Sequence, residues 1–193
     1  DLLTNTLGAL IGSVLGLIVP ARLRGVEKAA DAGAPRPVTR GRRLLGAVCD
    51  LVGTAILAGA AGTVVQLFLQ FALRREDLVS DGVIADVASG WVPIVVWLGV
   101  TLATGRTVGD LCVELRYDGG RFPEPVGRLL RFTGGIGGYL LLGELGAVGG
   151  ILVVAFVVAW LVLLFTTPAG RGLPGVITGR RLVDARASEP VAH

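Results

Sequence analysis

Two ionisable side chains, Arg43 and Asp50, stand near the beginning of a long apolar stretch. A spacing of seven residues is about two helical turns, so both side chains would lie on nearly the same face, separated by about 10 Å of helical rise. We therefore expect no direct bond between them and a separate polar partner for Asp50. Glu144 lies among leucines in another apolar stretch. Because an ionisable group inside a membrane costs several kcal/mol unless it faces protein or water, Arg43, Asp50 and Glu144 form the candidate ion or polar-network site.

The other side chains offer little catalytic chemistry. His193, the only histidine, is the last residue, and Cys49 and Cys112 lack both the CxxC spacing and the histidine that would complete a zinc site. The glycine-rich sequence 134–138 lacks the Lys-Ser/Thr pair of phosphate-binding loops and lies in an apolar run, which favours close helix packing. We expect no enzymatic activity, no metal and no cofactor.

The helices that must position these residues are expected in apolar stretches of the sequence. The chain has 193 residues, of which 52% are hydrophobic and 17% charged, whereas soluble domains contain roughly 25% charged residues. About 20 apolar residues span a membrane as a helix, a length that 44–73 and 83–103 reach. We predict an all-α polytopic transmembrane bundle of four to five membrane helices with a cytoplasmic amphipathic segment. The apolar stretches are 7–19, 44–73, 83–103 and 132–165.

The first stretch is open to two interpretations. A cleaved signal peptide is the competing one, but the stretch lacks a basic beginning and ends in Val19-Pro20 rather than in small residues, so a retained helix is favoured. The predicted organisation is an additional transmembrane helix, a basic cytoplasmic linker, a membrane domain and a disordered C-terminal tail. These parts cover residues 1–20, 21–39, 40–184 and 185–193.

The arginines predict the orientation, since short basic loops stay in the cytoplasm. The connection 21–43 carries seven basic residues and 105–131 carries five, so we place both in the cytoplasm and the protein in a bacterial inner membrane, as a multi-pass protein. A tail on the same side requires 132–165 to cross twice, as a hairpin pivoting near Gly146, Gly149 and Gly150. The alternative is one span from Val148, with 132–145 in the interface and the tail outside.

Small residues at intervals of four mark faces where helices can approach closely in lipid. Gly8, Gly12 and Gly16 form such a face in the first stretch, and Gly59 belongs to another one with Ala55 and Thr63. We expect these faces to pack against helices of this chain or of another subunit.

Three separated blocks resemble the RDD family of integral membrane proteins. The sequence 43–50, Arg-Leu-Leu-Gly-Ala-Val-Cys-Asp, is similar to the arginine and aspartate that open its first helix. In the second block, a Gly-x-Thr-x-Gly motif follows 83–103 and precedes an Asp-Gly turn and a Leu-Arg pair. In the third block, an Arg-Gly-Leu sequence stands near the end of the chain. The matching family-motif residues are Gly105, Thr107, Gly109, Arg131 and Arg171.

The chain also departs from that family. Pro174-Gly175 stands where the family usually has His-Asp, and Asp110 stands where a basic residue is usual. If the family's acidic residues carry ions, this chain lacks part of that apparatus. The resemblance implies transport, and actinobacterial relatives accompany mammalian-cell-entry lipid-import systems. Abundant Ala, Gly, Val and Arg with a single lysine agree with a GC-rich, actinobacterial genome.

Two functional hypotheses follow. In the first, the protein is a non-enzymatic accessory or stabilising subunit of a larger membrane transport assembly; in the alternative, it is a small secondary transporter, for example a cation/proton exchanger, that uses Asp50. The missing acidic position favours the first. The expected partners are the lipid bilayer, membrane-protein subunits and, at the basic loops, anionic lipid headgroups, with no nucleic acid.

Overall fold

The computed structural model describes residues 34–75 and 77–187. The predicted helix 1–20 with Gly8, Gly12 and Gly16, the linker up to residue 33 and the end of the tail lie outside the described residues.

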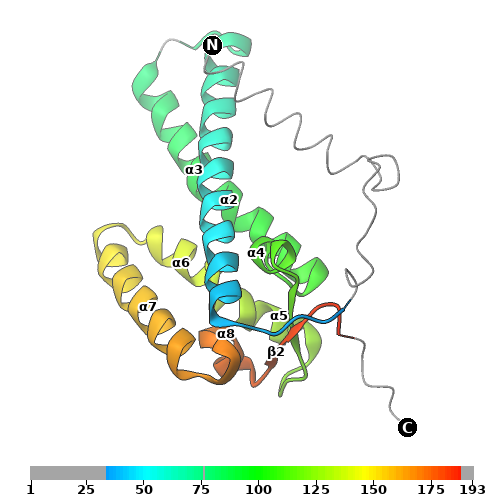
Figure 1. Ribbon diagram of the computed structural model, residues 1–193. Coiled ribbons are helices and arrows are strands. Elements are labelled where there is room, and N and C mark those ends of the chain that lie inside the picture. Colours follow the sequence, from blue (N-terminus) through cyan, green and yellow to red (C-terminus); the bar gives the residue numbers. More distant parts are fainter. Residues whose placement is uncertain (1–33, 76, 188–193) are drawn as a thin grey trace, which may run out of the picture. The chain divides into compact units, whose positions relative to one another are not determined.

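Two long antiparallel helices pack against each other in the described part (Figure 1). Helix α2 (Arg40–Leu67) begins where the Thr39 side chain accepts a hydrogen bond from the Arg42 amide, and it continues into a π-helical turn, η2 (Phe68–Ala72). Helix α3 (Leu78–Thr104) begins at Asp77, whose carboxylate caps two amides, and ends at Gly105, whose φ of 69° suits a residue without a Cβ. The two helices pack closely where Gly53 lies against Trp97.

The segment that follows α3 packs against both long helices. It contains α4 (Val108–Cys112), strand β1 (Leu115–Asp118) and α5 (Glu124–Thr133). Strand β1 pairs antiparallel with β2 (Arg181–Asp184), so that Leu115 faces Asp184 and Asp118 faces Arg181. This two-stranded sheet amends the all-α prediction, and it brings the end of the described chain to the same end of the bundle as residues 105–131.

The last helices form a second hairpin beside α2 (Figure 1). Helix α6 (Ile136–Gly143) turns into α7 (Gly146–Thr166) at Gly146, whose φ is 63°. Eight residues rise only about 12 Å, so α6 is too short to cross a membrane, and the two-crossing hairpin predicted for 132–165 is not confirmed. The chain then passes through η3 (Pro168–Gly170) and α8 (Gly172–Thr178) to β2.

Among the described residues, three helices are long and apolar enough to cross a membrane: Arg40–Ala72, Val79–Thr104 and Gly146–Thr166. The prediction of a mostly helical fold with helices that could span a membrane is confirmed, whereas the count of four to five spans is not. Large apolar side chains lie exposed along these helices, including Val64, Val95 and Ile151 at 64%, 64% and 74% exposure. Such a surface suits lipid rather than water.

The close contacts of α2 differ in part from the predicted glycine face. A Cβ added at Gly59 would meet no atom within 4 Å, so Gly59 makes no close helix contact in the described part of the chain. Gly46, Gly53 and Gly62 make those contacts instead, with Gly109 and Val113, with Trp97, and with Ala85 and Ser89 respectively. A small core of Ile94, Trp97, Phe132 and Ile136 joins α3 to α5 and α6.

Candidate functional site

A buried carboxylate, that of Asp110 in α4, lies at the centre of the candidate site. Arg43 of α2 donates from Nη1 to Asp110 Oδ1 at 2.7 Å, and Arg131 of α5 donates from Nη2 to the other oxygen, Oδ2. Asp110 is 0% exposed, Arg131 1% and Arg43 4%. Charged groups so far from water are tolerated when they are paired and hydrogen-bonded, so Asp110 ties three separate elements together.

The local sequence builds this position. Thr107 and Asp110 form a capping box at the beginning of α4, in which the Thr107 side chain accepts from the Asp110 amide and the Asp110 carboxylate accepts from the Thr107 amide. The cap holds the carboxylate at the beginning of the short helix, on the side that faces α2 and α5. A structural motif of four residues thus orients the acceptor that both arginines share.

Asp50 accepts hydrogen bonds only from uncharged groups of the same segment. Its Oδ2 accepts from the Thr107 hydroxyl and its Oδ1 from the Gly109 amide, both at 2.7 Å. Gly109 permits this approach, because a Cβ there would collide with the Gly46 carbonyl and with the Asp50 carboxylate. The structure has no hydrogen bond between Arg43 and Asp50.

Electrostatics keep the central carboxylate charged. Burial by itself would raise the pKa of Asp110, but the charges of Arg131 and Arg43, with the bonds from Thr107, hold that pKa below its ordinary value. The Tyr117 ring lies 4.5 Å from the Arg131 guanidinium carbon and 5.7 Å from that of Arg43, which is close enough for cation–π attraction. Burial raises the pKa of Tyr117, whose hydroxyl donates to the Arg171 carbonyl at 2.7 Å.

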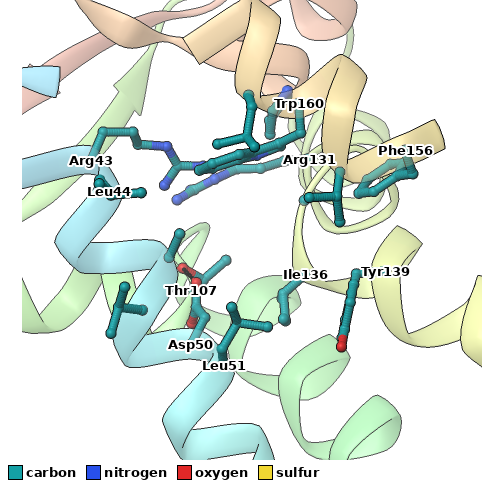
Figure 2. Close-up of a pocket in the computed structure, with 16 residues that line it drawn as sticks. Arg43, Leu44, Asp50, Leu51, Thr107, Arg131, Ile136, Tyr139, Phe156 and Trp160 are labelled. Carbon is teal, nitrogen blue, oxygen red and sulfur yellow. Dashed lines mark hydrogen bonds between the residues drawn. The ribbon is translucent and has the colours of Figure 1, made fainter. Parts of the chain in front are cut away.

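A cavity of about 190 Å³ adjoins this cluster, between α2, α6 and α7 (Figure 2). Asp50, Thr107, Arg43 and Arg131 form its polar end. Figure 2 shows the two guanidinium groups on one side of the cavity and Asp50 with Thr107 on the other. The other walls are apolar or aromatic and include Leu44, Ala47, Val48, Leu51, Ile136, Tyr139, Phe156, Val157, Trp160, Leu161 and Pro174.

The structure brings together most, but not all, of the residues that the sequence singles out. Arg43, Asp50, Thr107, Gly109 and Arg131 meet in the cluster, although they come from three separate parts of the chain.

The other predicted residues lie elsewhere. Glu144 is exposed at the turn between α6 and α7, where its carboxylate lies against Gly90 of α3, and it does not line the cavity. Gly105 ends α3, and Arg171 contributes a backbone carbonyl to Tyr117 rather than a side chain to the cavity. The candidate polar site therefore contains Arg43 and Asp50 without Glu144.

Sequence reasoning missed Asp110, the residue on which the cluster depends, because in the sequence it stands out only as a departure from the RDD pattern. The Thr-x-x-Asp spacing of Thr107 and Asp110 is a capping-box signature and could have indicated a carboxylate held in a fixed orientation at the beginning of a helix. Tyr117 and Trp160, which face the arginine side chains, gave no comparable signal, since each stands alone in its stretch.

The fold and the site define a mostly helical protein in which three helices are long and apolar enough to cross a membrane and a buried arginine–aspartate cluster lies beside a cavity. In the described part of the chain, no group of three or more histidine, cysteine, aspartate or glutamate side chains is placed to hold a metal ion. Comparison with protein-family models, with curated proteins and with solved structures gives no match.

Proposed function

We propose that the protein is a non-enzymatic accessory or stabilising subunit of a larger bacterial inner-membrane transport assembly. The observation that carries the proposal is an open surface of small residues on the halves of α2 and α3 that lie farther from the cluster. We call this surface the small-residue groove. Its residues are Ala58, Gly59, Gly62, Thr63, Gly82, Ala85, Asp86 and Ser89.

The small-residue groove offers room for another helix. A Cβ at Gly59 or at Gly82 would have no neighbour within 4 Å among the described residues, although both positions lie on long apolar helices. Helices associate in lipid mainly by close packing at small side chains and by occasional polar contacts, which Thr63 and Ser89 could supply. This surface supports a partner subunit, and the face of Gly8, Gly12 and Gly16 is a second place for one.

Copurification in a mild detergent, read by mass spectrometry, tests the proposal. Leucine at Gly59 adds bulk where a Cβ would have no neighbour within 4 Å, and Gly12→Leu adds bulk to the glycine face predicted for the first apolar stretch. Gly99→Leu is the matched control, because Gly99 on α3 also has no neighbour within 4 Å and lies outside the groove. We expect Gly59→Leu or Gly12→Leu to lose partner proteins that Gly99→Leu retains; unchanged copurification in both would contradict the accessory role.

One observation favours the transporter alternative. Asp50 lines the cavity and accepts bonds from Thr107 and Gly109 rather than from an arginine, so its carboxylate is not neutralised by a direct ion pair. Intramembrane carboxylates in such positions carry protons or cations in transporters. If the protein is a carrier, proteoliposomes with Asp50→Asn should lose a cation or proton flux that the parent protein shows. Parent proteoliposomes without flux would count against this alternative.

The proposed orientation places the end that holds the cluster in the cytoplasm. The arginines of α2, the segment 105–131 and strand β2 all gather at that end, as the bond from Arg42 to Asp184 illustrates at 2.8 Å. Excess basic charge favours the cytoplasmic side. A single cysteine at the exposed Asp118, in a background without Cys49 and Cys112, should react with an impermeant maleimide in inverted vesicles and stay unreacted in intact cells. The reverse pattern would overturn the orientation. That the chain is similar to the RDD family is likewise part of the proposal, and it is based on the three sequence blocks described above.

A further inference from the structure

The cavity described above opens through apolar walls that belong to two membrane helices. Leu44, Val48 and Leu51 on α2 are 42%, 45% and 44% exposed, and Val157 and Leu161 on α7 are 36% and 37% exposed. Both helices are long and apolar enough to cross a membrane, so the opening between them faces lipid. A molecule that enters from this side passes along aliphatic side chains before it reaches any polar group.

The polar end of the cavity contains guanidinium donors that lack partners. Arg131 uses only Nη2 on Asp110, and its Nε and Nη1 are buried without a hydrogen-bond partner among the described residues. The same holds for Nε of Arg43. Buried donors normally find acceptors, because an unmade hydrogen bond in the interior is unfavourable. Arg43 and Arg131 line the polar end of the cavity, so the two guanidinium groups that hold these donors border it.

We infer that the cavity binds one anionic phospholipid from the surrounding membrane, with its phosphodiester at Arg43 and Arg131 and an acyl chain along α2 and α7. Guanidinium groups bind phosphate oxygens through charge-assisted hydrogen bonds, and both guanidinium groups border the cavity. The aromatic rings of Trp160 and Phe156 border the path that the chain would take (Figure 2). This inference goes beyond the accessory role and does not depend on it.

The geometry favours a lipid over a free anion. A hydrated phosphate gains nothing from the apolar walls and would cross them to reach the arginines, whereas an acyl chain buries its methylene groups against them at about 0.8 kcal/mol each. Asp50, on the opposite side of the cavity, repels an anion and so confines the phosphate to the arginine side (Figure 2). A lipid bound at the arginines has only part of its length in the cavity of about 190 Å³, and the rest extends through the opening.

Native mass spectrometry of the full chain, released from detergent after incubation with defined lipids, tests the inference. The probes are phosphatidylglycerol, diacylglycerol, which has the acyl chains without the phosphodiester, and inorganic phosphate. We expect one phosphatidylglycerol per chain, retained about tenfold over diacylglycerol, which corresponds to about 1.4 kcal/mol. Inorganic phosphate at millimolar concentration should not displace it.

Matched variants separate the cavity from the general lipid surface. Val48→Trp and Val157→Trp place an indole ring in the cavity, and we expect each to lower phosphatidylglycerol retention about tenfold. Val52→Trp and Val158→Trp are the controls, because both valines are exposed on the same helices at 52% and 54% but do not line the cavity. These controls should retain the lipid as the parent protein does.

The arginine contact is tested by its effect on lipid selectivity. Arg131→Lys keeps the positive charge but cannot form the paired bonds, so the preference for phosphatidylglycerol should fall towards equal retention. The variant is compared with the parent protein only if its thermal unfolding midpoint shows that it is folded; if it is not, the four tryptophan variants decide. Equal retention of both lipids by the parent protein, displacement by inorganic phosphate, or equal retention by the cavity variants and their controls would each overturn the inference.

Discussion

Replacing Asp110 with asparagine removes the charge on which two buried arginines depend. Arg43 and Arg131 both donate to this carboxylate, and their side chains are 5% and 1% exposed, so water cannot take its place. Asparagine has nearly the same shape and keeps one carbonyl oxygen, so the packing of α4 and part of its cap remain. The substitution therefore isolates the electrostatic contribution of the cluster.

The expected loss of stability is large. Removing one partner of a buried ion pair costs about 3–5 kcal/mol, because the other charge stays buried without compensation. We expect the lower end, about 3 kcal/mol, because the asparagine oxygen still accepts one hydrogen bond. At about 2–4 °C per kcal/mol for a chain of this size, the unfolding midpoint should fall by about 6–12 °C.

Tryptophan fluorescence during thermal unfolding in one detergent measures this midpoint. Unfolding of membrane proteins in detergent is often irreversible, so parent and variants must be heated at the same rate. Asp118→Asn is the matched control: Asp118 lies at the exposed end of β1 and accepts only from the Gly119 amide, so its midpoint should stay within about 2 °C. Equal midpoints for Asp110→Asn and Asp118→Asn would refute the claim that Asp110 holds α2, α4 and α5 together.

Three further outcomes follow from the same contacts. Thr107→Val should destabilise the protein by about 1–3 kcal/mol, because it removes the hydroxyl that donates to Asp50 and accepts from the Asp110 amide, whereas Thr107→Ser should nearly restore the parent midpoint. Gly109→Ala should lower the midpoint because its Cβ would collide with the Gly46 carbonyl, while Gly59→Ala, which meets no atom, should leave it unchanged. The pKa of Asp110 is lower in the folded protein than in the unfolded chain. Its stabilising contribution is therefore fully present above about pH 4 and is lost as the pH falls through the lower, folded-state pKa. Urea unfolding at pH 3 and pH 6 should show this loss of Asp110's contribution in the parent protein and not in Asp110→Asn.

The apolar pattern predicts the long helices well because length and composition decide them locally. The stretch 44–73 corresponds to α2 with its π-helical turn, and 83–103 to most of α3. In 132–165 no charged residue marks an end except Glu144, so the pattern cannot distinguish a short α6 from a full crossing. The turn itself was expected near Gly146, where the positive φ occurs. What remained open was the length of each arm, which depends on packing against α2 and α3.

The cluster could be predicted only in part, because its contacts join residues far apart in the sequence. The family-like blocks supplied Arg43, Asp50, Thr107 and Arg131, but nothing in their spacing shows which arginine contacts which carboxylate. Helical geometry did indicate that Asp50 needs a partner outside its own helix. That Thr107 and Gly109 provide it, while Asp110 takes both arginines, depends on how α4 folds back onto α2.

The stability of the cluster and its proposed affinity for a lipid have the same cause. Had each arginine its own carboxylate, more of its donors would be satisfied within the chain and the polar end of the cavity would attract an anion less strongly. Asp50 bonds to Thr107 and Gly109 instead. Among the described residues Asp110 is therefore the carboxylate that bonds to both guanidinium groups, and Nε of each has no acceptor there. A phosphate bound there would supply the missing acceptors and should stabilise the fold as well. Phosphatidylglycerol should therefore raise the unfolding midpoint of the parent protein, and raise it less in Val48→Trp than in Val52→Trp.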